Sequence, residues 1–300
     1  MKKKLIFSGA ATALVTPLRH GEIDIDALDG LIERQIKGGI SALVIGGTTG
    51  EAATLSDVER RDLYTHVKGR VRGRTKIIFG TGTNDTRLAI KHTRLADSIG
   101  TDGLLVVTPY YNKGTFSGVT EHYRRIAAET DIPIILYNVP SRTGVNLTVK
   151  QLEELSRVEN IVGIKEASDS VDRLTELAGF GDELFLYAGN DTQIYATLAL
   201  GGMGVISVLS NLYPEYISKI CSDYFIGNRD AARRGQLDAF RLSRAMFIET
   251  NPSPIKYALS LAGICSSELR LPLSPPCDAA RAEIEEELRA FKGLSDGTSL

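Results

Sequence analysis

Short runs of apolar residues alternate along the chain with longer stretches in which apolar and polar positions follow a helical spacing. The runs are rich in Val, Ile and Leu and lack a clean apolar–polar alternation, which is typical of strands covered on both faces. We expect a buried strand in each run, at residues 10–17, 41–47, 76–82, 103–109, 132–138, 161–165, 184–189 and 204–208.

The stretches between these runs carry the start and stop signals of helices. Ser56 and Glu59 have the spacing of a capping box, and Thr148 and Gln151 repeat it. Gly100 follows another helical pattern and supplies a stop. The pattern therefore predicts that strands and helices alternate.

Eight strands, each followed by a helix at a spacing of roughly 30 residues, favour an α/β fold of the (β/α)8 barrel type. A doubly wound sheet is the alternative, but the segment VTPLRHGEID after the first run lacks the Gly-rich turn of that fold. From about residue 228 the strand pattern gives way to helical patterns. We expect a barrel domain over residues 1–227 and a C-terminal helical extension over 228–300.

Composition narrows the class of protein. The chain has 300 residues, 43 % of them hydrophobic, and a formal net charge of -2, which gives no electrostatic reason to expect nucleic acid or an anionic membrane as partner. Three scattered cysteines and four isolated histidines form no disulfide framework and no metal-ligand spacing. No apolar run approaches a membrane span, and the one at the start is too short for a signal peptide. We expect a cytoplasmic protein without a metal.

In a (β/α)8 barrel the catalytic groups lie at the C-terminal ends of the strands, where the loops meet around one opening. The predicted strands place hydroxyl, phenol, guanidinium and ammonium groups at those ends. They are Thr48, Thr49, Tyr110, Tyr111, Tyr137, Arg142 and Lys165, with the segment AGND following the seventh strand.

Lys165 is the most informative of these residues, because it ends an apolar strand and lysine is rarely buried without a partner. Glu166 offers a structural ion pair, yet neighbours on a strand point to opposite faces, which weakens that explanation. The gathering of the other polar residues around the same opening favours a catalytic lysine.

These side chains together support carbonyl chemistry. In apolar surroundings more of a lysine is present as the free amine, which attacks a ketone to form a Schiff base. Tyr137, one strand away from Lys165, is placed to move protons. The threonine hydroxyls and nearby N–H groups suit one carboxylate, and Arg142 suits a second. We predict condensation of a small 2-oxo acid with an acidic aldehyde, with the Schiff base on Lys165 in place of a cofactor.

Several motifs then indicate a family. GGTTGE, VVTPYYNK, LYNVPSRTG, VGIKEAS, AGND and GGMGVISV resemble, in order and spacing, those of dihydrodipicolinate synthases, pyruvate-dependent class I lyases also called 4-hydroxy-tetrahydrodipicolinate synthases. The resemblance runs from about residue 8 to beyond residue 259. The GxTGE motif and the lysine strand are shared with N-acetylneuraminate lyase and keto-deoxy-sugar aldolases. The arginine in YNVPSRTG is more discriminating and marks the synthases.

The resemblance implies roles for individual residues. Lys165 matches the Schiff-base lysine, and a proton relay is implied for Tyr137, Thr48 and Tyr111, with Tyr111 supplied by the neighbouring subunit. Substrate contacts are implied for Thr49 with the carboxylate of pyruvate, for Arg142 with aspartate semialdehyde, and for Gly189 and the carbonyl of Ile206 as lesser ones.

The implied reaction joins pyruvate and L-aspartate 4-semialdehyde to give 4-hydroxy-tetrahydrodipicolinate, on the route to diaminopimelate and lysine. The implied assembly is a homodimer at minimum and commonly a homotetramer, a dimer of tight dimers. Two alternatives stay open: a sugar-acid lyase of the same superfamily, against which Arg142 argues, and a non-catalytic barrel that binds 2-oxo acids.

The sequence departs from the family at the site where lysine inhibits some members. Asn84 and Tyr110 are retained, but Arg60 stands where a histidine or another effector-binding residue is usual and Leu88 where a glutamate is usual. Losing a carboxylate that would pair with the effector's ammonium weakens binding. We expect weak or absent inhibition by lysine.

Overall fold

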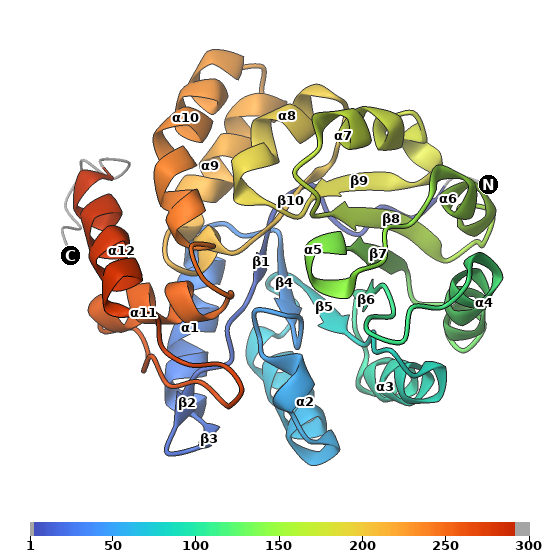
Figure 1. Cartoon of the computed structure of the whole chain (residues 1–300), viewed down its shortest axis with the longest axis horizontal. Helices are drawn as coiled ribbons and strands as arrows, with labels where there is room; N and C mark the ends of the chain where they lie inside the picture. The colour runs from blue at the N-terminus through green and yellow to red at the C-terminus, as the bar shows by residue number, and fades with distance from the viewer. Residues whose placement is uncertain (1–2, 292–300) are drawn as a thin grey trace.

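The computed structural model describes residues 3–291 and has a closed barrel of parallel strands at its centre (Figure 1). The eight barrel strands follow the order β1-β10-β9-β8-β7-β6-β5-β4 around the ring. Their bounds are β1 (Gly9–Ala13), β4 (Ala42–Ile45), β5 (Lys76–Gly80), β6 (Gly103–Val107), β7 (Ile134–Asn138), β8 (Ile161–Glu166), β9 (Phe185–Ala188) and β10 (Gly204–Ser207). The predicted (β/α)8 barrel is confirmed.

Two short strands that the apolar pattern did not predict, β2 (Leu18–Arg19) and β3 (Glu22–Ile23), form a separate hairpin. They are too short to show a period of two. The hairpin belongs to the loop after β1, at the same end of the barrel as the other loops that follow strands.

Helices surround the barrel (Figure 1). They are α1 (Ile25–Lys37), α2 (Asp57–Val71), α3 (Thr86–Ile99), α4 (Phe116–Ala127), α6 (Val149–Leu155), α7 (Val171–Ala178), α8 (Ile194–Ala199) and α9 (Pro214–Phe225). Both expected capping boxes form, Ser56 with Glu59 on α2 and Thr148 with Gln151 on α6. None of the helices within residues 3–291 is both long and apolar enough to cross a bilayer.

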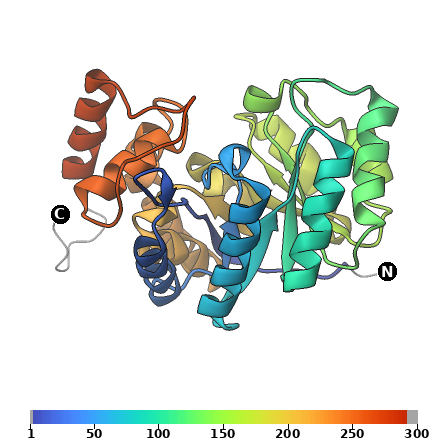
Figure 2. The same cartoon turned by 90° about the horizontal axis from the view of Figure 1, so that it is seen from below.

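Three further helices, α10 (Arg229–Ala245), α11 (Ser253–Leu261) and α12 (Asp278–Ala290), follow the barrel. The first packs on α8 and α9, and α12 packs on α10 and α11. Figure 2 shows these C-terminal helices gathered at one side of the barrel. The expected boundary between 227 and 228 falls in the turn between α9 and α10, and the last residues of the expected extension, 292–300, lie outside the described part.

The core has two layers, one inside the barrel and one between the strands and the helices. Inside, Tyr187 stacks on Phe7 with ring centroids 4.5 Å apart and donates its hydroxyl to the Phe7 carbonyl. Gly204 begins β10, and a Cβ there would lie 1.8 Å from the Gly9 carbonyl oxygen. The GGMG segment therefore serves close packing at the N-terminal end of the barrel, away from the ends where chemistry was predicted.

Candidate active site

Lys165 and Tyr137 are direct partners across β8 and β7, near the C-terminal ends of both strands. Their side chains are buried, at 4 % and 7 % exposure. The Nζ atom of Lys165 lies 4.2 Å from the centroid of the Tyr137 ring. No acidic side chain within residues 3–291 forms a salt bridge with Lys165. An amine in this setting is held against an aromatic face rather than neutralised by an acid.

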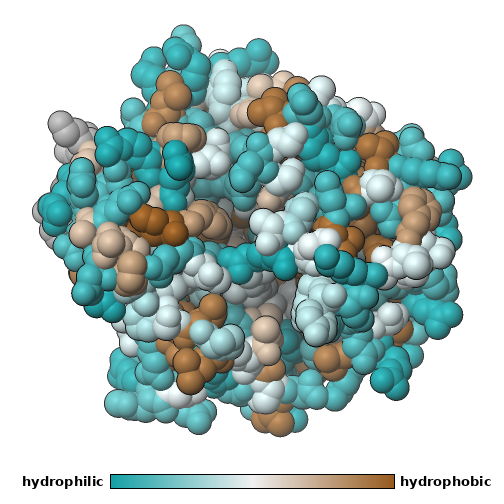
Figure 3. All heavy atoms as spheres, in the orientation of Figure 1, coloured by the Kyte–Doolittle hydropathy of each residue, from teal (hydrophilic) through white to brown (hydrophobic). Residues whose placement is uncertain are grey.

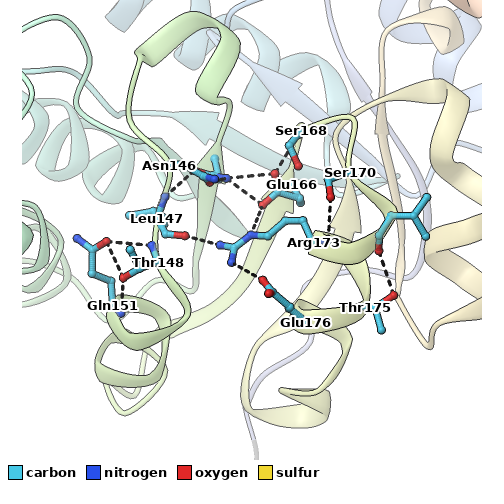
Figure 4. A network of polar contacts seen from close by, with 12 residues as sticks. Asn146, Leu147, Thr148, Gln151, Glu166, Ser168, Ser170, Arg173, Thr175 and Glu176 are labelled. Atoms are coloured by element: carbon cyan, nitrogen blue, oxygen red, sulfur yellow. Dashed lines mark hydrogen bonds and ion pairs between the residues drawn. The ribbon is translucent and has the colours of Figure 1, made fainter.

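Glu166 lies on the other face of β8, as the alternation of a strand requires. It is fully buried and accepts hydrogen bonds from Nδ2 of Asn138 at 2.9 and 3.1 Å and from the Ser168 N–H at 2.9 Å. Its Oε2 lies 3.5 Å from Nε of Arg173. Figure 4 shows this network, which joins β8 to α6 and α7 and does not include Lys165. The structural alternative for Lys165, an ion pair with Glu166, is therefore wrong.

A cavity of about 780 Å³ opens at the C-terminal end of the barrel. Its walls bring together the predicted residues Lys165, Tyr137, Thr49, Arg142 and Gly189. A second cavity of about 410 Å³ shares Tyr137 and Arg142 with the first and adds Thr48. In the space-filling view the surface is hollowed near its centre, among pale and hydrophilic residues (Figure 3).

The threonines lie on a compact loop that follows β4. Gly46 has a φ of 65°, and a Cβ there would lie 2.6 Å from the Tyr64 hydroxyl, so the turn requires glycine. The Glu51 N–H donates to the Thr48 carbonyl at 3.1 Å and closes the loop. Thr49 is buried, whereas Thr48 is half-buried beside Tyr137 in the second cavity.

Asn251, which the sequence reasoning did not single out, connects the two predicted carboxylate-binding residues. Its Nδ2 donates to Oγ1 of Thr49 at 2.9 Å, and its carbonyl accepts from Nη2 of Arg142 at 2.9 Å. It lies between α10 and α11, so the C-terminal helical region contributes to the site. The available signal was an asparagine before a proline in a break between helices, which indicates a turn but no particular role.

Asp191 is a second residue of the site without a predicted role, although it belongs to the quoted AGND motif. It is buried in the wall of the larger cavity, and its Oδ2 accepts from the N–H groups of Val208 and Leu209 at 3.0 Å each. Burial raises the pKa of its carboxyl, while these hydrogen bonds and the charge of Lys165 act in the opposite direction.

Three predicted residues differ in how they relate to the cavities. Gly189 lines the larger one, and a Cβ there would lie 2.6 Å from Cβ of Ala167, so only glycine fits. Ile206 is fully buried inside β10, and Val208 rather than Ile206 lines the cavity. Tyr111 is 88 % exposed with a φ of 68° and lines neither cavity.

The predicted regulatory residues only partly converge. Tyr110, Arg60 and Leu88 line the smaller cavity, whereas Asn84 does not and accepts a hydrogen bond at its carbonyl from Asn112. Arg60 is buried and donates to the carbonyls of Gly80 and Ala52 and to the Tyr64 hydroxyl. Its guanidinium therefore serves the packing of α2 against neighbouring loops.

Comparison with known proteins shows which family has this arrangement of residues. The model of the dihydrodipicolinate synthetase family matches residues 6–291. The chain belongs to this family. Within the family, a 4-hydroxy-tetrahydrodipicolinate synthase of Clostridium novyi (strain NT) is 43 % identical over 281 residues, which are 93 % of this chain and 94 % of that protein. The family and the lyase class predicted from the sequence are confirmed.

Solved structures of the family agree. The 4-hydroxy-tetrahydrodipicolinate synthase of Methylacidiphilum fumariolicum SolV superposes with a TM-score of 0.94 at 41 % identity, covering 96 % of this chain and 97 % of that one. A dihydrodipicolinate synthase variant described as monomeric superposes with a TM-score of 0.93 at 38 % identity, covering 95 % and 97 %. The family fold thus extends over nearly the whole chain.

Proposed function

We propose that this protein condenses pyruvate with L-aspartate 4-semialdehyde to give 4-hydroxy-tetrahydrodipicolinate, a step towards diaminopimelate and lysine. The observation that carries the proposal is the buried amine of Lys165, which faces Tyr137 in a cavity that also contains Arg142. The names of the family's members and the predicted chemistry of the residues support the same reaction.

The covalent steps begin on Lys165. Its free amine adds to the ketone carbon of pyruvate and water leaves, which gives an iminium ion. The iminium withdraws electrons, so a methyl proton leaves and an enamine forms. The enamine carbon then attacks the aldehyde carbon, and the resulting alkoxide takes up a proton. The amino group of the second substrate finally attacks the iminium carbon, closes the ring and releases Lys165. The lysine provides the electron sink, so the proposal requires no cofactor.

Protons must move at several of these steps, and the ring of Tyr137 lies against the amine in the wall of the same cavity. Thr48 lines a cavity with Tyr137 and is the proposed next member of the relay. Tyr111 is exposed and outside both cavities of its own chain, which supports its donation to a neighbouring copy. We therefore propose a homodimer at minimum, assembled further as a dimer of tight dimers.

Two groups hold the carboxylates in this proposal. Thr49, oriented by Asn251, binds the carboxylate of pyruvate, and Arg142 binds that of the aldehyde by parallel hydrogen bonds. A sugar-acid lyase would present a neutral surface to a polyol at the place of Arg142, which disfavours that alternative. The free cysteines of the described residues give no sign of an oxidising compartment, in keeping with a cytoplasmic enzyme.

Borohydride reduction in the presence of pyruvate, followed by peptide mass mapping, tests the central step. We expect a stable adduct on the peptide that contains Lys165, and none in a Lys165→Ala variant. An adduct on another lysine, or none in the unaltered protein, would refute the mechanism. Turnover with aspartate semialdehyde compared with N-acetylneuraminate and keto-deoxy-gluconate separates the synthase from a sugar-acid lyase, and turnover of none of them would favour the non-catalytic barrel.

A further inference from the structure

Glu51, the last residue of the GGTTGE loop, has an unusual backbone conformation. Its φ of 53° and ψ of 37° lie in the left-handed region, which a glutamate rarely adopts. Such a conformation persists only where the surroundings hold it. The loop that carries Thr48 and Thr49 therefore depends on the contacts made by Glu51.

Those contacts come from the C-terminal helical region. The Nζ atom of Lys256, on α11, lies 2.6 Å from Oε1 of Glu51 and 2.6 Å from the Glu268 carbonyl. Oε2 of Glu51 accepts from the Arg270 N–H at 3.0 Å. Both charged side chains are buried, Lys256 at 0 % exposure and Glu51 at 4 %. The carboxylate is thus bound on both oxygens, away from water.

A buried ion pair is a poor way to gain stability, because desolvation offsets much of the attraction between the charges. Such a pair can instead fix the relative position of the two segments that carry it, since each partner accepts only a narrow range of geometries. The same short segment also carries Asn251, five positions before Lys256, which donates to Thr49. Residues 251–256 therefore hold the threonine loop at two points, through Thr49 and through Glu51.

We propose that the buried Glu51–Lys256 pair positions Thr48 and Thr49 for pyruvate, so that the C-terminal helical region is part of the catalytic apparatus. Lys256 lines neither cavity and acts only through Glu51. Glu51 lines the smaller cavity, but both of its carboxylate oxygens are already bound, by Lys256 and by the Arg270 N–H, so both are positioning residues. The inference rests on the proposed function for the identity of the bound acid. The placement of the loop itself can be measured without substrate.

The first experiment is steady-state kinetics of Lys256→Met, Glu51→Gln and the double variant. We expect kcat/KM for pyruvate to fall in each single variant by on the order of ten- to a hundredfold, mostly through KM, because misplaced binding groups are that costly. Thermal stability should fall in the single variants and recover in the double variant, where no buried charge lacks a partner. KM should stay raised in the double variant.

Leu259→Ala is the matched control, because it removes a fully buried side chain from the same helix and leaves both charges in place. It should lower the thermal stability without raising KM for pyruvate. If KM in the double variant returned to the unaltered value together with stability, the pair would be only structural and the proposal would be overturned. The same conclusion follows if Leu259→Ala raised KM as much as Glu51→Gln.

Hydrogen exchange of the ligand-free protein gives a second readout that does not depend on the reaction. Amides of the loop, residues 46–55, should exchange on the order of tenfold faster in Glu51→Gln than in the unaltered protein and in Leu259→Ala. Unchanged exchange in Glu51→Gln would overturn the proposal. If exchange were faster in Glu51→Gln but the unaltered protein gave no pyruvate adduct on Lys165, the proposed function would be refuted. The positioning of the loop by Glu51 would still be established.

Discussion

Lys165 and Tyr137 form a register pair across two adjacent barrel strands, with the lysine Nζ 4.2 Å from the centre of the phenol ring. The pairing fixes both side chains on rigid strands rather than on loops, and it excludes water from most of their surface. An aromatic face attracts a cation only modestly, and no acidic side chain of the described residues forms a salt bridge with Lys165. Tyr137 thus both packs against the amine and lines the cavity.

The roles of the hydroxyl and of the ring of Tyr137 can be distinguished by Tyr137→Phe, which removes the hydroxyl and keeps the ring. The ring should keep Lys165 in place, so borohydride should still trap pyruvate on the lysine. Turnover should fall on the order of a hundred- to ten-thousandfold, because a general acid–base group has been lost. Initial rates with both substrates and mass mapping of the adduct check this, and full activity of the variant would remove Tyr137 from the proton relay.

Arg142 is predicted to select the aldehyde. In Arg142→Ala, turnover with aspartate semialdehyde should fall by more than about tenfold, since a charge-assisted contact is lost, while the pyruvate adduct still forms. Arg244 is a suitable control because it lines the same cavity and is exposed like Arg142, whereas the hydrogen bond to the Asn251 carbonyl comes from Arg142. Arg244→Ala should change the rate much less. Equal losses in the two variants would show a general effect of positive charge instead of a specific contact.

The exposed Tyr111 allows a test of donation between subunits. Lys165→Ala and Tyr111→Ala should each be nearly inactive alone. Co-expression of the two should restore about a quarter of the unaltered activity per chain, because random pairing makes half of the dimers hybrids and each hybrid has one complete site. Activity assays of the co-expressed mixture check this, and the hybrid isolated by two different tags should have about half of the unaltered activity per chain, because one of its two sites is complete. An inactive hybrid would contradict the donation of Tyr111 by a partner.

The positions of Lys165, Tyr137 and the threonines could be predicted because they depend on local rules. Each follows an apolar run, and parallel strands in a barrel bring their C-terminal ends to one opening. Most boundaries of the strands were also close, because apolar runs interrupted by Gly and Pro are clear signals, but the first run, 10–17, continues four residues past the end of β1. Helix α3 was predicted as well, although its buried face is built from Ala89, His92 and Ala96 rather than from large apolar residues.

The contributions of Asn251 and Lys256 could not be predicted in this way. They lie far from Lys165 in the chain and reach the site only because α11 packs back towards the loop after β4. No period or motif in one segment encodes its contact with another. The left-handed backbone of Glu51 is equally hidden, since glutamate has no preference for that conformation and the tertiary contacts impose it.

Insensitivity to lysine is a prediction about the smaller cavity. Leu88 presents no carboxylate there to pair with an ammonium group, and Arg60 adds a positive charge to the wall. Initial rates should therefore be unchanged by millimolar lysine. Leu88→Glu should increase the sensitivity, because a charge-assisted hydrogen bond becomes available. A submillimolar inhibition constant for the unaltered enzyme would contradict this account.

Acid should destabilise the protein between pH 6.5 and 4 through His122. Its ring is buried on α4, with Nδ1 2.9 Å from Oγ1 of Thr86, and burial lowers the pKa of His122 from 6.5 to about 4 against a small opposing effect of Asp85. The folded state therefore favours the neutral ring. The stability that the neutral His122 ring contributes is complete above pH 6.5. It is lost as the pH falls, because the unfolded chain takes up the proton first.

The loss attributable to His122 is on the order of 2 kcal/mol at pH 5, at about 1.4 kcal/mol for each unit of pKa difference. Urea unfolding at pH 7 and pH 5 should show this difference, and His122→Gln should reduce it. His20→Asn, at an exposed left-handed position, is the control for replacing a histidine that is not buried. The pKa of His92 is also lowered, first by burial, so part of the dependence should persist in His122→Gln. Glu33 and Glu59, each with a pKa lowered from 4.5 to about 2, lose their stabilising contribution as the pH falls through 4.5 towards 2, so they add little to the difference between pH 7 and pH 5. An unaltered pH dependence in His122→Gln would show that the buried ring is not its source.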